Sequence, residues 1–383
     1  MNNKPTTKSL FLSFLRLGLT AFGGPAMVAH IRELSTRRYQ WLDETDFKNG
    51  LALCQSIPGA TAMQTAAYVG LKVRGISGAF AAYLGFGLPA FLLMLILSFI
   101  YVRFSDLPRF ISLFSGLQVI VVAIIISSVY SFGRNIANNY KSLIIALLSA
   151  SVFWAGISPF MAIVGAGIAG MAFSRASASK GAVDSDMRTS AAKQVTMILI
   201  SFLFCLAALY FLNSKLFDLG AVMLKIDIFA FGGGFASLPL MLHEIVMGRG
   251  WLNSETFMDG IALGQVTPGP IVITATFVGY LVYGLSGAVV ATIAIFAPSF
   301  FMLVIVAPFF DRLKNSAYFL RAIDGVFASF VGLLLFVCFK FATTVPWDVA
   351  RILLGLAALA ALIRKVDILY IVLAGAVVSV FIL

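Results

Sequence analysis

Long apolar runs recur along the whole chain, and only short polar stretches separate them. Such runs are typical of helices that cross a bilayer, because a helix satisfies its own backbone hydrogen bonds where water is absent. A transmembrane barrel would instead alternate apolar and polar residues along short strands. The pattern therefore predicts an all-α polytopic integral membrane protein. The composition agrees, with 61% hydrophobic and 11% charged residues among 383.

A motif near the start of the chain returns in its second half. The stretch AFGGPAMVAH at residues 21–30 corresponds to AFGGGFASLPLMLH at residues 230–243, an offset of 209 positions. Further matches follow in the same order, at offsets of 209 or 210: Trp41-Leu42 with Trp251-Leu252, Pro58-Gly59 with Pro268-Gly269, and Pro89 with Pro298. Chance does not keep so many glycines, prolines and tryptophans in register. We predict two homologous halves, a first repeat at 1–174 and a second repeat at 214–383.

The segment between the repeats determines their relative orientation. A polar stretch at 175–193 predicts a cytoplasmic linker loop, and the apolar run after it predicts a linking transmembrane helix at 194–213. This extra helix would give the second repeat the opposite orientation across the membrane. Lys and Arg gather in short cytoplasmic loops; the loops flanking residues 49–70 carry six of them, whereas their counterparts carry only Arg249. The sequence thus predicts an inverted-topology repeat with a cytoplasmic N-terminus.

Both repeats interrupt their apolar helices with glycine and proline. Phe-Gly-Gly stands at 22–24 and 231–233, and Pro-Gly at 58–59 and 268–269 turns another segment back on itself. Broken backbone at membrane depth is tolerated where it lines a cavity, and paired breaks point to a transporter's binding site. Each new half-helix presents free N–H groups and a partial positive charge. We therefore expect broken, re-entrant helices that aim backbone donors at an oxyanion.

Two cations lie inside apolar segments at matching places. Arg16 and Lys225 each stand six residues before the phenylalanine of Phe-Gly-Gly. A charge in such a segment costs roughly 2.5 to 3.5 kcal/mol on insertion scales, so both are candidates for anion binding. The alternatives are a side chain that reaches the membrane interface and, for Lys225, an ion pair with Asp227.

Four further polar residues have two readings each. Gln55 and Gln265 stand three residues before each Pro-Gly, where they would donate hydrogen bonds to an anion or join two helices. His243 and Glu244 are candidates for proton coupling, and an interfacial position is the alternative.

The sequence disfavours several other classes of protein. Cys54, Cys205 and Cys338 are far apart within apolar runs, so they predict packing rather than a metal site. The chain has no phosphate-loop motif, and its basic residues are scattered rather than gathered in a stripe. We expect no catalytic residues, no cofactor and no nucleic-acid partner. A membrane-embedded enzyme acting on a lipid or polyprenyl phosphate is a weak alternative, because it would need a cluster of carboxylates or histidines.

The motif set resembles that of one known family. Phe-Gly-Gly-Pro and Phe-Gly-Gly-Gly, each followed by Trp-Leu and Gln-x-x-Pro-Gly, closely resemble the chromate ion transporter (CHR) family, long two-domain type, over nearly the whole chain. The resemblance implies a bacterial inner (plasma) membrane protein that exports chromate and confers resistance, with sulfate as a close structural analogue. One departure is Pro-Gly-Ala at 58–60, where we expect Pro-Gly-Pro as at 268–270. This leaves the geometry of the first hairpin open.

The candidate substrate-binding residues are the breaks, the two cations and the polar residues beside them: Arg16, Phe22, Gly23, Gly24, Pro25, Gln55, Pro58, Gly59, Thr61, Lys225, Phe231, Gly232, Gly233, Gly234, Gln265, Pro268, Gly269, Pro270 and Thr274. The expected partners are a chromate or sulfate anion and the lipid bilayer, and a homodimer is left open. The main alternative function is an importer of sulfate or another oxyanion with the same architecture.

Overall fold

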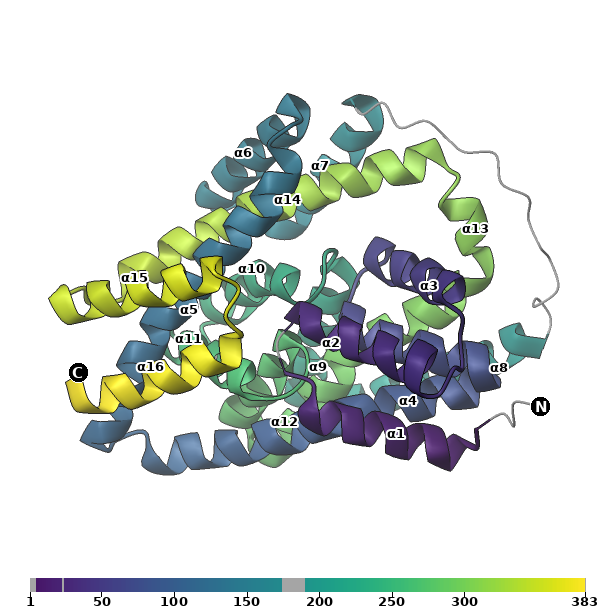
Figure 1. The fold of residues 1–383 in the computed structure, drawn as a ribbon, viewed down its shortest axis with the longest axis horizontal. Helices are drawn as coiled ribbons and strands as arrows, with labels where there is room; N and C mark the ends of the chain where they lie inside the picture. Colours follow the sequence, from purple (N-terminus) through teal and green to yellow (C-terminus); the bar gives the residue numbers. More distant parts are fainter. Residues whose placement is uncertain (1–4, 23, 174–189, 383) are drawn as a thin grey trace. The chain divides into compact units, whose positions relative to one another are not determined.

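The computed structural model describes residues 5–22, 24–173 and 190–382, and in these ranges every regular element is a helix (Figure 1). The all-α prediction is therefore confirmed. Four of the described helical segments are long and apolar enough to cross a bilayer: Thr61–Phe104, Pro108–Ile136, Ile271–Phe309 and Ala317–Thr344. Of the predicted linker at 175–193, residues 175–189 lie outside the described ranges, and the apolar run after the linker belongs to the helix Ser190–Leu212.

The two halves place the same kinds of element in the same order. The first half forms α1 (Thr7–Thr20), α2 (Gly24–Arg32), the π-helix η1 (Glu33–Arg38), α3 (Glu44–Ser56), α4 (Thr61–Phe104), α5 (Pro108–Ile136), α6 (Tyr140–Trp154) and α7 (Pro159–Phe173). After α8 (Ser190–Leu212), the second half forms α9 (Ser214–Phe229), η2 (Gly234–Ala236), α10 (Ser237–Met241), the π-helix η3 (Leu242–Gly248), α11 (Ser254–Val266), η4 (Ile271–Ile273), α12 (Thr274–Val306), η5 (Ala307–Phe309), α13 (Phe310–Leu313), α14 (Ala317–Thr344), α15 (Val349–Ile363) and α16 (Ile368–Ile382).

Matching caps begin the helix that precedes each Pro-Gly turn. The side chain of Asp43 accepts a hydrogen bond from the backbone N–H of Asp46 at 2.7 Å, and that of Asn253 accepts one from the N–H of Thr256 at 2.7 Å. A short polar side chain at this position satisfies one of the free N–H groups of the first turn. The two halves thus start α3 and α11 by the same local device, 210 residues apart.

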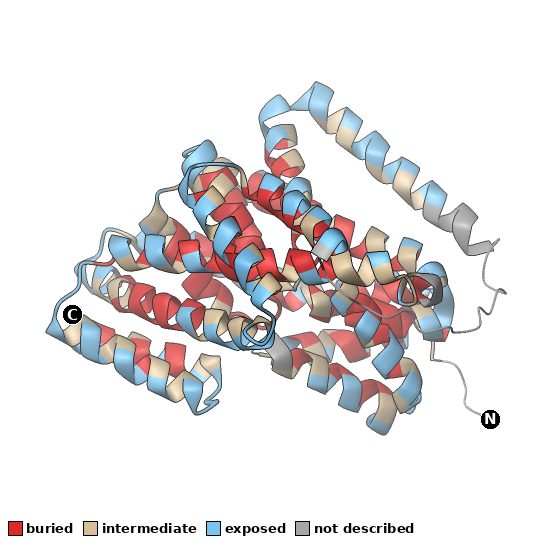
Figure 2. Cartoon of the chain, turned by 90° about the horizontal axis from the view of Figure 1, so that it is seen from above, coloured by how far each residue is buried: buried red, intermediate tan, exposed pale blue. Residues whose placement is uncertain are grey.

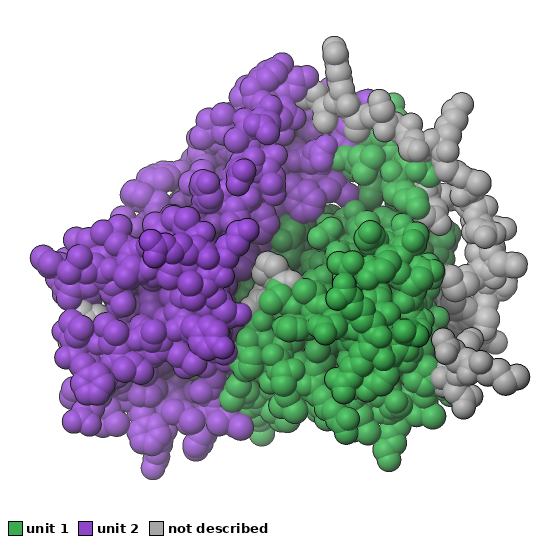
Figure 3. Space-filling model, viewed as in Figure 1, with its two compact units in different colours: residues 1–95, 176–234, 268–320 green, residues 96–175, 235–267, 321–383 purple. Residues whose placement is uncertain are grey.

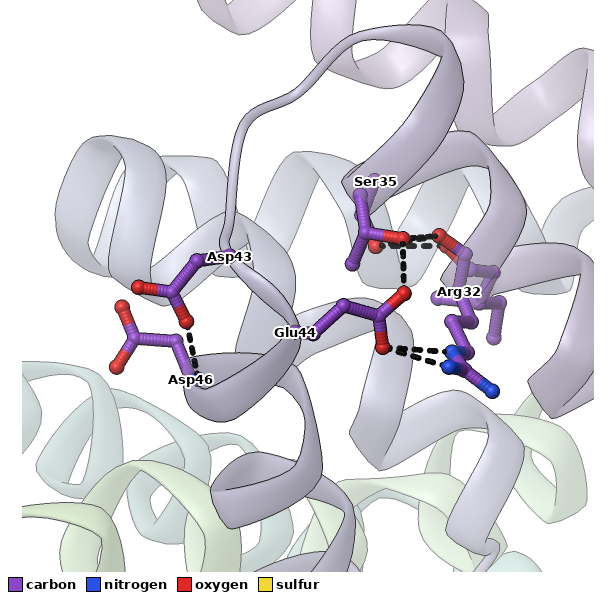
Figure 4. A network of polar contacts seen from close by, with 7 residues as sticks. Arg32, Ser35, Asp43, Glu44 and Asp46 are labelled. Atoms are coloured by element: carbon purple, nitrogen blue, oxygen red, sulfur yellow. Dashed lines mark hydrogen bonds and ion pairs between the residues drawn. The ribbon is translucent and has the colours of Figure 1, made fainter.

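A short polar network ties the end of α2 and the middle of η1 to the start of α3 (Figure 4). The guanidinium of Arg32 contacts the Glu44 carboxylate at 2.7 Å, and the Thr36 hydroxyl donates to the same carboxylate at 3.4 Å. The hydrogen bond from Arg32 holds the pKa of Glu44 below its ordinary value. Both members of the ion pair are exposed, so it orders the connection between the helices more than it stabilises the fold.

The long helices α4 and α12 each fold back at a matching glycine. Gly75 has φ +66° and Gly284 has φ +62°, a backbone conformation that glycine adopts without a steric penalty. In a straight helix Gly70 and Gly78, eight residues apart, would be separated by about 12 Å. They are instead in contact, because a Cβ added to Gly70 would overlap the carbonyl of Gly78. A Cβ at Gly279 would likewise overlap the carbonyl of Gly287. Each element is therefore two helices packed against one another.

The segment before the first fold also turns back, at Pro58-Gly59. A Cβ added to Gly50 in α3 would overlap the ring of Tyr68 in α4. Because Gly50 precedes the turn and Tyr68 follows it by a similar number of residues, α3 and the start of α4 run side by side in opposite directions. This is the broken hairpin that the sequence predicts at residues 49–70.

The described chain divides into two compact units, and each unit takes segments from both halves (Figure 3). Unit 1 comprises residues 1–95, 176–234 and 268–320, and unit 2 comprises residues 96–175, 235–267 and 321–383. Within unit 1, α9 packs along α12; within unit 2, α15 and α16 pack along α5. Neither unit is the product of one repeat alone.

Many helices have an exposed face (Figure 2), and many large apolar side chains are among the exposed residues. In α4 Phe99 is 58% exposed, and in α8 Phe204 and Phe211 are 73% and 83% exposed. A protein in water rarely leaves so much large apolar surface uncovered. These faces suit contact with lipid chains, which agrees with a multi-pass membrane protein.

Candidate functional site

The helix breaks predicted from the sequence are present in unit 1. Helix α1 ends at Thr20, whose hydroxyl donates to the carbonyl of Arg16 at 3.2 Å, and α2 begins at Gly24. In the second half α9 ends at Phe229, and Gly232 and Gly233 follow with φ +103° and +86°. Gly23 lies outside the described residues. The chain therefore leaves the helix at the two places where Phe-Gly-Gly stands.

The two Pro-Gly turns have the same backbone conformation. Gly59 and Gly269 both have φ +116°, which strains any residue with a side chain. Ala60 therefore does not alter the first turn, although the sequence departs there from Pro-Gly-Pro. Instead, the backbone N–H of Ala60 donates a hydrogen bond to the Ser299 hydroxyl at 3.0 Å. A proline has no N–H to donate, so Pro270 lacks this bond.

Each Pro-Gly turn is hydrogen-bonded to the helix break of the other half. The N–H of Gly59 donates to the carbonyl of Ala230 at 2.9 Å, and the N–H of Gly269 donates to the carbonyl of Ala21 at 3.2 Å. Ala21 and Ala230 are the residues just before the two Phe-Gly-Gly motifs. This reciprocal pair of bonds gives the centre of unit 1 a local two-fold relation between the repeats.

The break of the second half lies beside the first turn of α4. A Cβ added to Gly233 would stand 3.3 Å from the hydroxyl oxygen of Thr61, the first residue of α4. In the other half η4 runs directly into α12 at Thr274, whose backbone N–H donates to the carbonyls of Ile271 and Val272 and whose buried hydroxyl donates to the carbonyl of Ile271 at 2.8 Å. The start of a helix leaves N–H groups without intrahelical partners and carries partial positive charge. Phe-Gly-Gly-Gly thus brings the backbone of the break close to the start of α4, in a place where a side chain at Gly233 would be crowded.

A buried carboxylate joins this region, and the sequence assigned it no role in binding. Asp227 is 1% exposed, and its Oδ2 accepts hydrogen bonds from the backbone N–H of Ser299 at 2.8 Å and from the Ser299 hydroxyl at 2.7 Å. The same serine hydroxyl accepts from Ala60, so Asp227 is linked to the N-terminal end of α4. An acidic residue inside an apolar segment is the signal that could have drawn attention to it.

The two predicted cations lie on exposed parts of unit 1. Arg16 in α1 lines a cavity of about 300 Å³ together with Lys8, the hydroxyl residues Thr6, Ser9, Ser13 and Tyr39, and Leu12. Lys225 is exposed on α9. Among the described residues, Ser299 donates both hydrogen bonds that Asp227 accepts. The hydrogen-bond partner of this carboxylate is therefore Ser299, and not Lys225 as the sequence suggested. Arg16 therefore lies in a cationic, hydroxyl-lined recess at some distance along α1 from the break.

The two glutamines differ in their surroundings. Gln55 is exposed at the end of α3 in unit 1. Gln265 belongs to unit 2, where its Nε2 is buried and has no hydrogen-bond partner among the described residues. Their roles in anion binding stay predictions.

His243 and Glu244 also belong to unit 2. The His243 ring packs against Phe153 and Phe160, with ring centroids 5.9 and 6.3 Å apart. Glu244 forms an ion pair with Arg249 at 2.6 Å. An ion pair gives this carboxylate a structural role, and proton coupling at the two residues stays a prediction.

Comparisons with known proteins agree with this architecture. The profile of the family described as "Chromate transporter" matches residues 8–171 and again residues 217–380. The chain is 43% identical to an uncharacterized transporter of Methanocaldococcus jannaschii, over 100% of this chain and 96% of that protein. It is 33% identical to a chromate transport protein of Cupriavidus metallidurans, over 94% of this chain and 88% of that protein. It is 30% identical to a chromate transport protein of Pseudomonas aeruginosa, over 85% of this chain and 78% of that protein. No solved structure matches the chain.

Proposed function

This chain belongs to the chromate transporter family, and on that premise we propose that it is a secondary transporter that exports chromate, with sulfate as a second substrate. The observation that carries the proposal is the reciprocal bonding of Gly59 to Ala230 and of Gly269 to Ala21. These bonds gather two helix breaks and two helix starts in one place. Paired breaks of this kind are the places where transporters bind their substrates.

The chemistry of the breaks suits a tetrahedral dianion. Such an ion needs several hydrogen-bond donors, and backbone N–H groups at helix starts provide them together with partial positive charge. The proposed substrate-binding groups are the backbone of the two Phe-Gly-Gly motifs, the Pro-Gly turns, the first residues of α4, and the start of the helical segment that η4 and α12 form together. Arg16 and Lys225 would raise the local concentration of the anion from exposed positions nearby.

The membrane potential favours export. With the inside negative, each negative charge gains about 2.3 kcal/mol per 100 mV on moving outward, and a dianion gains about twice that. Uptake would need a coupled cation to overcome this gradient. An importer of sulfate is therefore the second candidate, and it differs from the first in its dependence on an ion gradient.

The domain boundaries are inferred from the sequence repeat, and the orientation in the membrane from the distribution of Lys and Arg. We propose repeats at 1–174 and 214–383, joined by the cytoplasmic linker 175–193 and the linking helix at 194–213. We place the protein in the inner (plasma) membrane with a cytoplasmic N-terminus.

Transport by inverted membrane vesicles tests the function. We expect labelled chromate to accumulate in vesicles that contain the protein when the vesicle interior is made positive, because the interior then corresponds to the cell exterior. Sulfate is measured in parallel, with and without an imposed pH gradient. Vesicles without the protein are the control. Equal accumulation in both preparations for both anions would contradict the proposal.

The inverted repeat predicts that corresponding loops face opposite sides of the membrane. Single cysteines placed near Arg37 and near Asn253, in a variant without Cys54, Cys205 and Cys338, should react with an impermeant thiol reagent from opposite faces. The basis is the concentration of Lys and Arg around residues 49–70. Labelling of both sites from one face would refute the inversion and leave the linking helix without a topological role.

A further inference from the structure

The polar cluster around Asp227 exists in one half of the protein only. It consists of Asp227, Ser299 and the N–H of Ala60. The residues at the corresponding positions, 209 or 210 places away, are Gly18, Ala90 and Pro270. None of these three has a polar side chain, and proline has no backbone donor. The cluster is therefore not part of the local two-fold relation between the repeats, and its role is one that the protein needs at a single place.

Two acceptor atoms of this region have no hydrogen-bond partner among the described residues. They are Oδ1 of Asp227 and Oε1 of Gln64, and both side chains are buried, at 1% and 0% exposure. The Gln64 amide cannot be reversed, because its Nε2 donates to the carbonyls of Pro58 at 2.6 Å and Ser299 at 3.3 Å. An amide oxygen in that place would face two carbonyl oxygens. Both unpaired atoms therefore belong to side chains held by Ser299.

We propose that Asp227 is the proton-binding residue of this transporter and takes up one proton when the anion binds. The inference rests on the proposed function. The proton comes from solvent and forms an O–H bond at Oδ1, so the carboxylate becomes a neutral carboxylic acid. A buried charge without a counter-cation is costly, and the bond to Oδ2 alone leaves half of this carboxylate unpaired.

The position of Asp227 explains why the proton and the anion bind together. The Ser299 hydroxyl donates to Asp227 and accepts from the N–H of Ala60, which directly precedes α4. The partial positive charge at the start of α4 therefore stabilises an ionised Asp227. An oxyanion at the same helix start would compete for that charge and would repel the carboxylate. Neutralising Asp227 removes the repulsion, so the dianion and the proton favour one another's binding.

Few other charged or titratable groups lie on the elements around Asp227. On its own helix the other charged residues, Lys215, Asp218 and Lys225, are exposed. Helix α12, which packs along α9, has no charged residue between Thr274 and Val306. Helix α8 has none between Thr196 and Leu212. From α4, Tyr83 faces the carboxylate and donates its hydroxyl to the carbonyl of Phe296 at 2.7 Å. Among the described side chains of these elements, Asp227 is therefore the group placed to exchange a proton.

The chemistry of the cluster suits a proton better than a metal cation. A sodium-sized ion needs several oxygen ligands directed at one point, whereas a proton needs a single oxygen. Only two buried side-chain oxygens in the described part of the chain lack a partner, and one of them is the carboxylate oxygen itself.

The test is proton uptake upon anion binding by the purified full-length protein in detergent. Sulfate is the probe because it stays a dianion across the pH range, and chromate in its alkaline dianion range is the second probe. Calorimetry in buffers of different ionisation enthalpy gives the number of protons bound. We expect about one proton per anion, and an affinity that falls about tenfold per pH unit above its midpoint.

Three variants assign the proton. Asp227→Asn mimics the neutral acid, so it should bind the anion as tightly as the wild type does at acidic pH, without proton uptake and without pH dependence. Ser299→Ala removes a donor to the carboxylate, so it should keep the uptake and move the midpoint to higher pH. Glu44→Gln changes an exposed carboxylate to an amide and should behave as the wild type does.

The possible failures are distinguishable. Anion binding by the wild type without proton uptake would refute the inference and leave the proposed function intact. Proton uptake that persists in Asp227→Asn, or loss of anion binding by this variant at every pH, would also refute it. A wild type that binds neither sulfate nor chromate would refute the proposed function, and the inference with it.

Discussion

Replacing Gly233 with leucine is expected to abolish chromate transport while leaving insertion into the membrane intact. Gly233 has φ +86°, and a Cβ at this position would stand 3.3 Å from the Thr61 hydroxyl. A branched side chain would close the approach to the start of α4. Loss of two charge-assisted hydrogen bonds at about 1.5 kcal/mol each corresponds to about a 100-fold loss of affinity.

The measurement is the initial rate of labelled chromate transport against concentration, in vesicles that contain matched amounts of each protein. Gly165→Leu is the control, because Gly165 in α7 has open space where its Cβ would be and a backbone without positive φ. This control should transport at the wild-type rate. Normal transport by Gly233→Leu would show that Gly233 serves packing alone.

Removing either predicted cation is expected to weaken the apparent affinity for chromate. Arg16→Gln and Lys225→Gln each remove one positive charge from the exposed surface of unit 1. At a separation of about 8 Å and an effective dielectric constant of about 20, attraction of a dianion to one charge is about 4 kcal/mol before screening by salt. Screening at exposed positions reduces this strongly, so we expect a change of about 3- to 10-fold.

Charge-preserving substitutions separate the long-range attraction from short contacts. Arg16→Lys and Lys225→Arg keep the charge and change the geometry of the donors, so they should retain part of the affinity. Lys340→Gln is the control, because Lys340 is an exposed lysine of α14 in unit 2. If both glutamine variants of Arg16 and Lys225 match the wild type, these cations serve structure, and binding must depend on the helix starts and the glutamines.

The kinetic effect of replacing Arg16 indicates whether this residue acts before or after the anion reaches the helix breaks. Arg16 lines its recess with Lys8 and several hydroxyl residues. A weaker apparent affinity in Arg16→Gln, with the same maximal rate, would indicate that the recess gathers the anion before it reaches the breaks. A lower maximal rate with the same affinity would instead indicate a role during the conformational change.

The class of the fold and the places where its helices break follow from local features of the sequence. Apolar runs, the repeated Phe-Gly-Gly and the repeated Pro-Gly are local features, and their consequences for the backbone are local as well. Glycine at a positive φ and proline at a helix start act within a few residues. For this reason the local pattern predicts Gly59 and Gly269 at turns and Gly232 and Gly233 at a break, and all four have a positive φ.

Which breaks meet, and which hydrogen bonds hold them together, depends on the packing of segments that are far apart in the sequence. Gly59 bonds to Ala230 and Gly269 to Ala21, and nothing in a local pattern states which distant carbonyl a turn will reach. The sequence offered Lys225 as a partner for Asp227 because the two are neighbours along the chain. The fold instead presents Ser299 to this carboxylate, since α9 packs along α12 and residues two apart on a helix point in different directions. A buried carboxylate is stabilised by the donors that packing brings to it, and that choice is made by the whole fold.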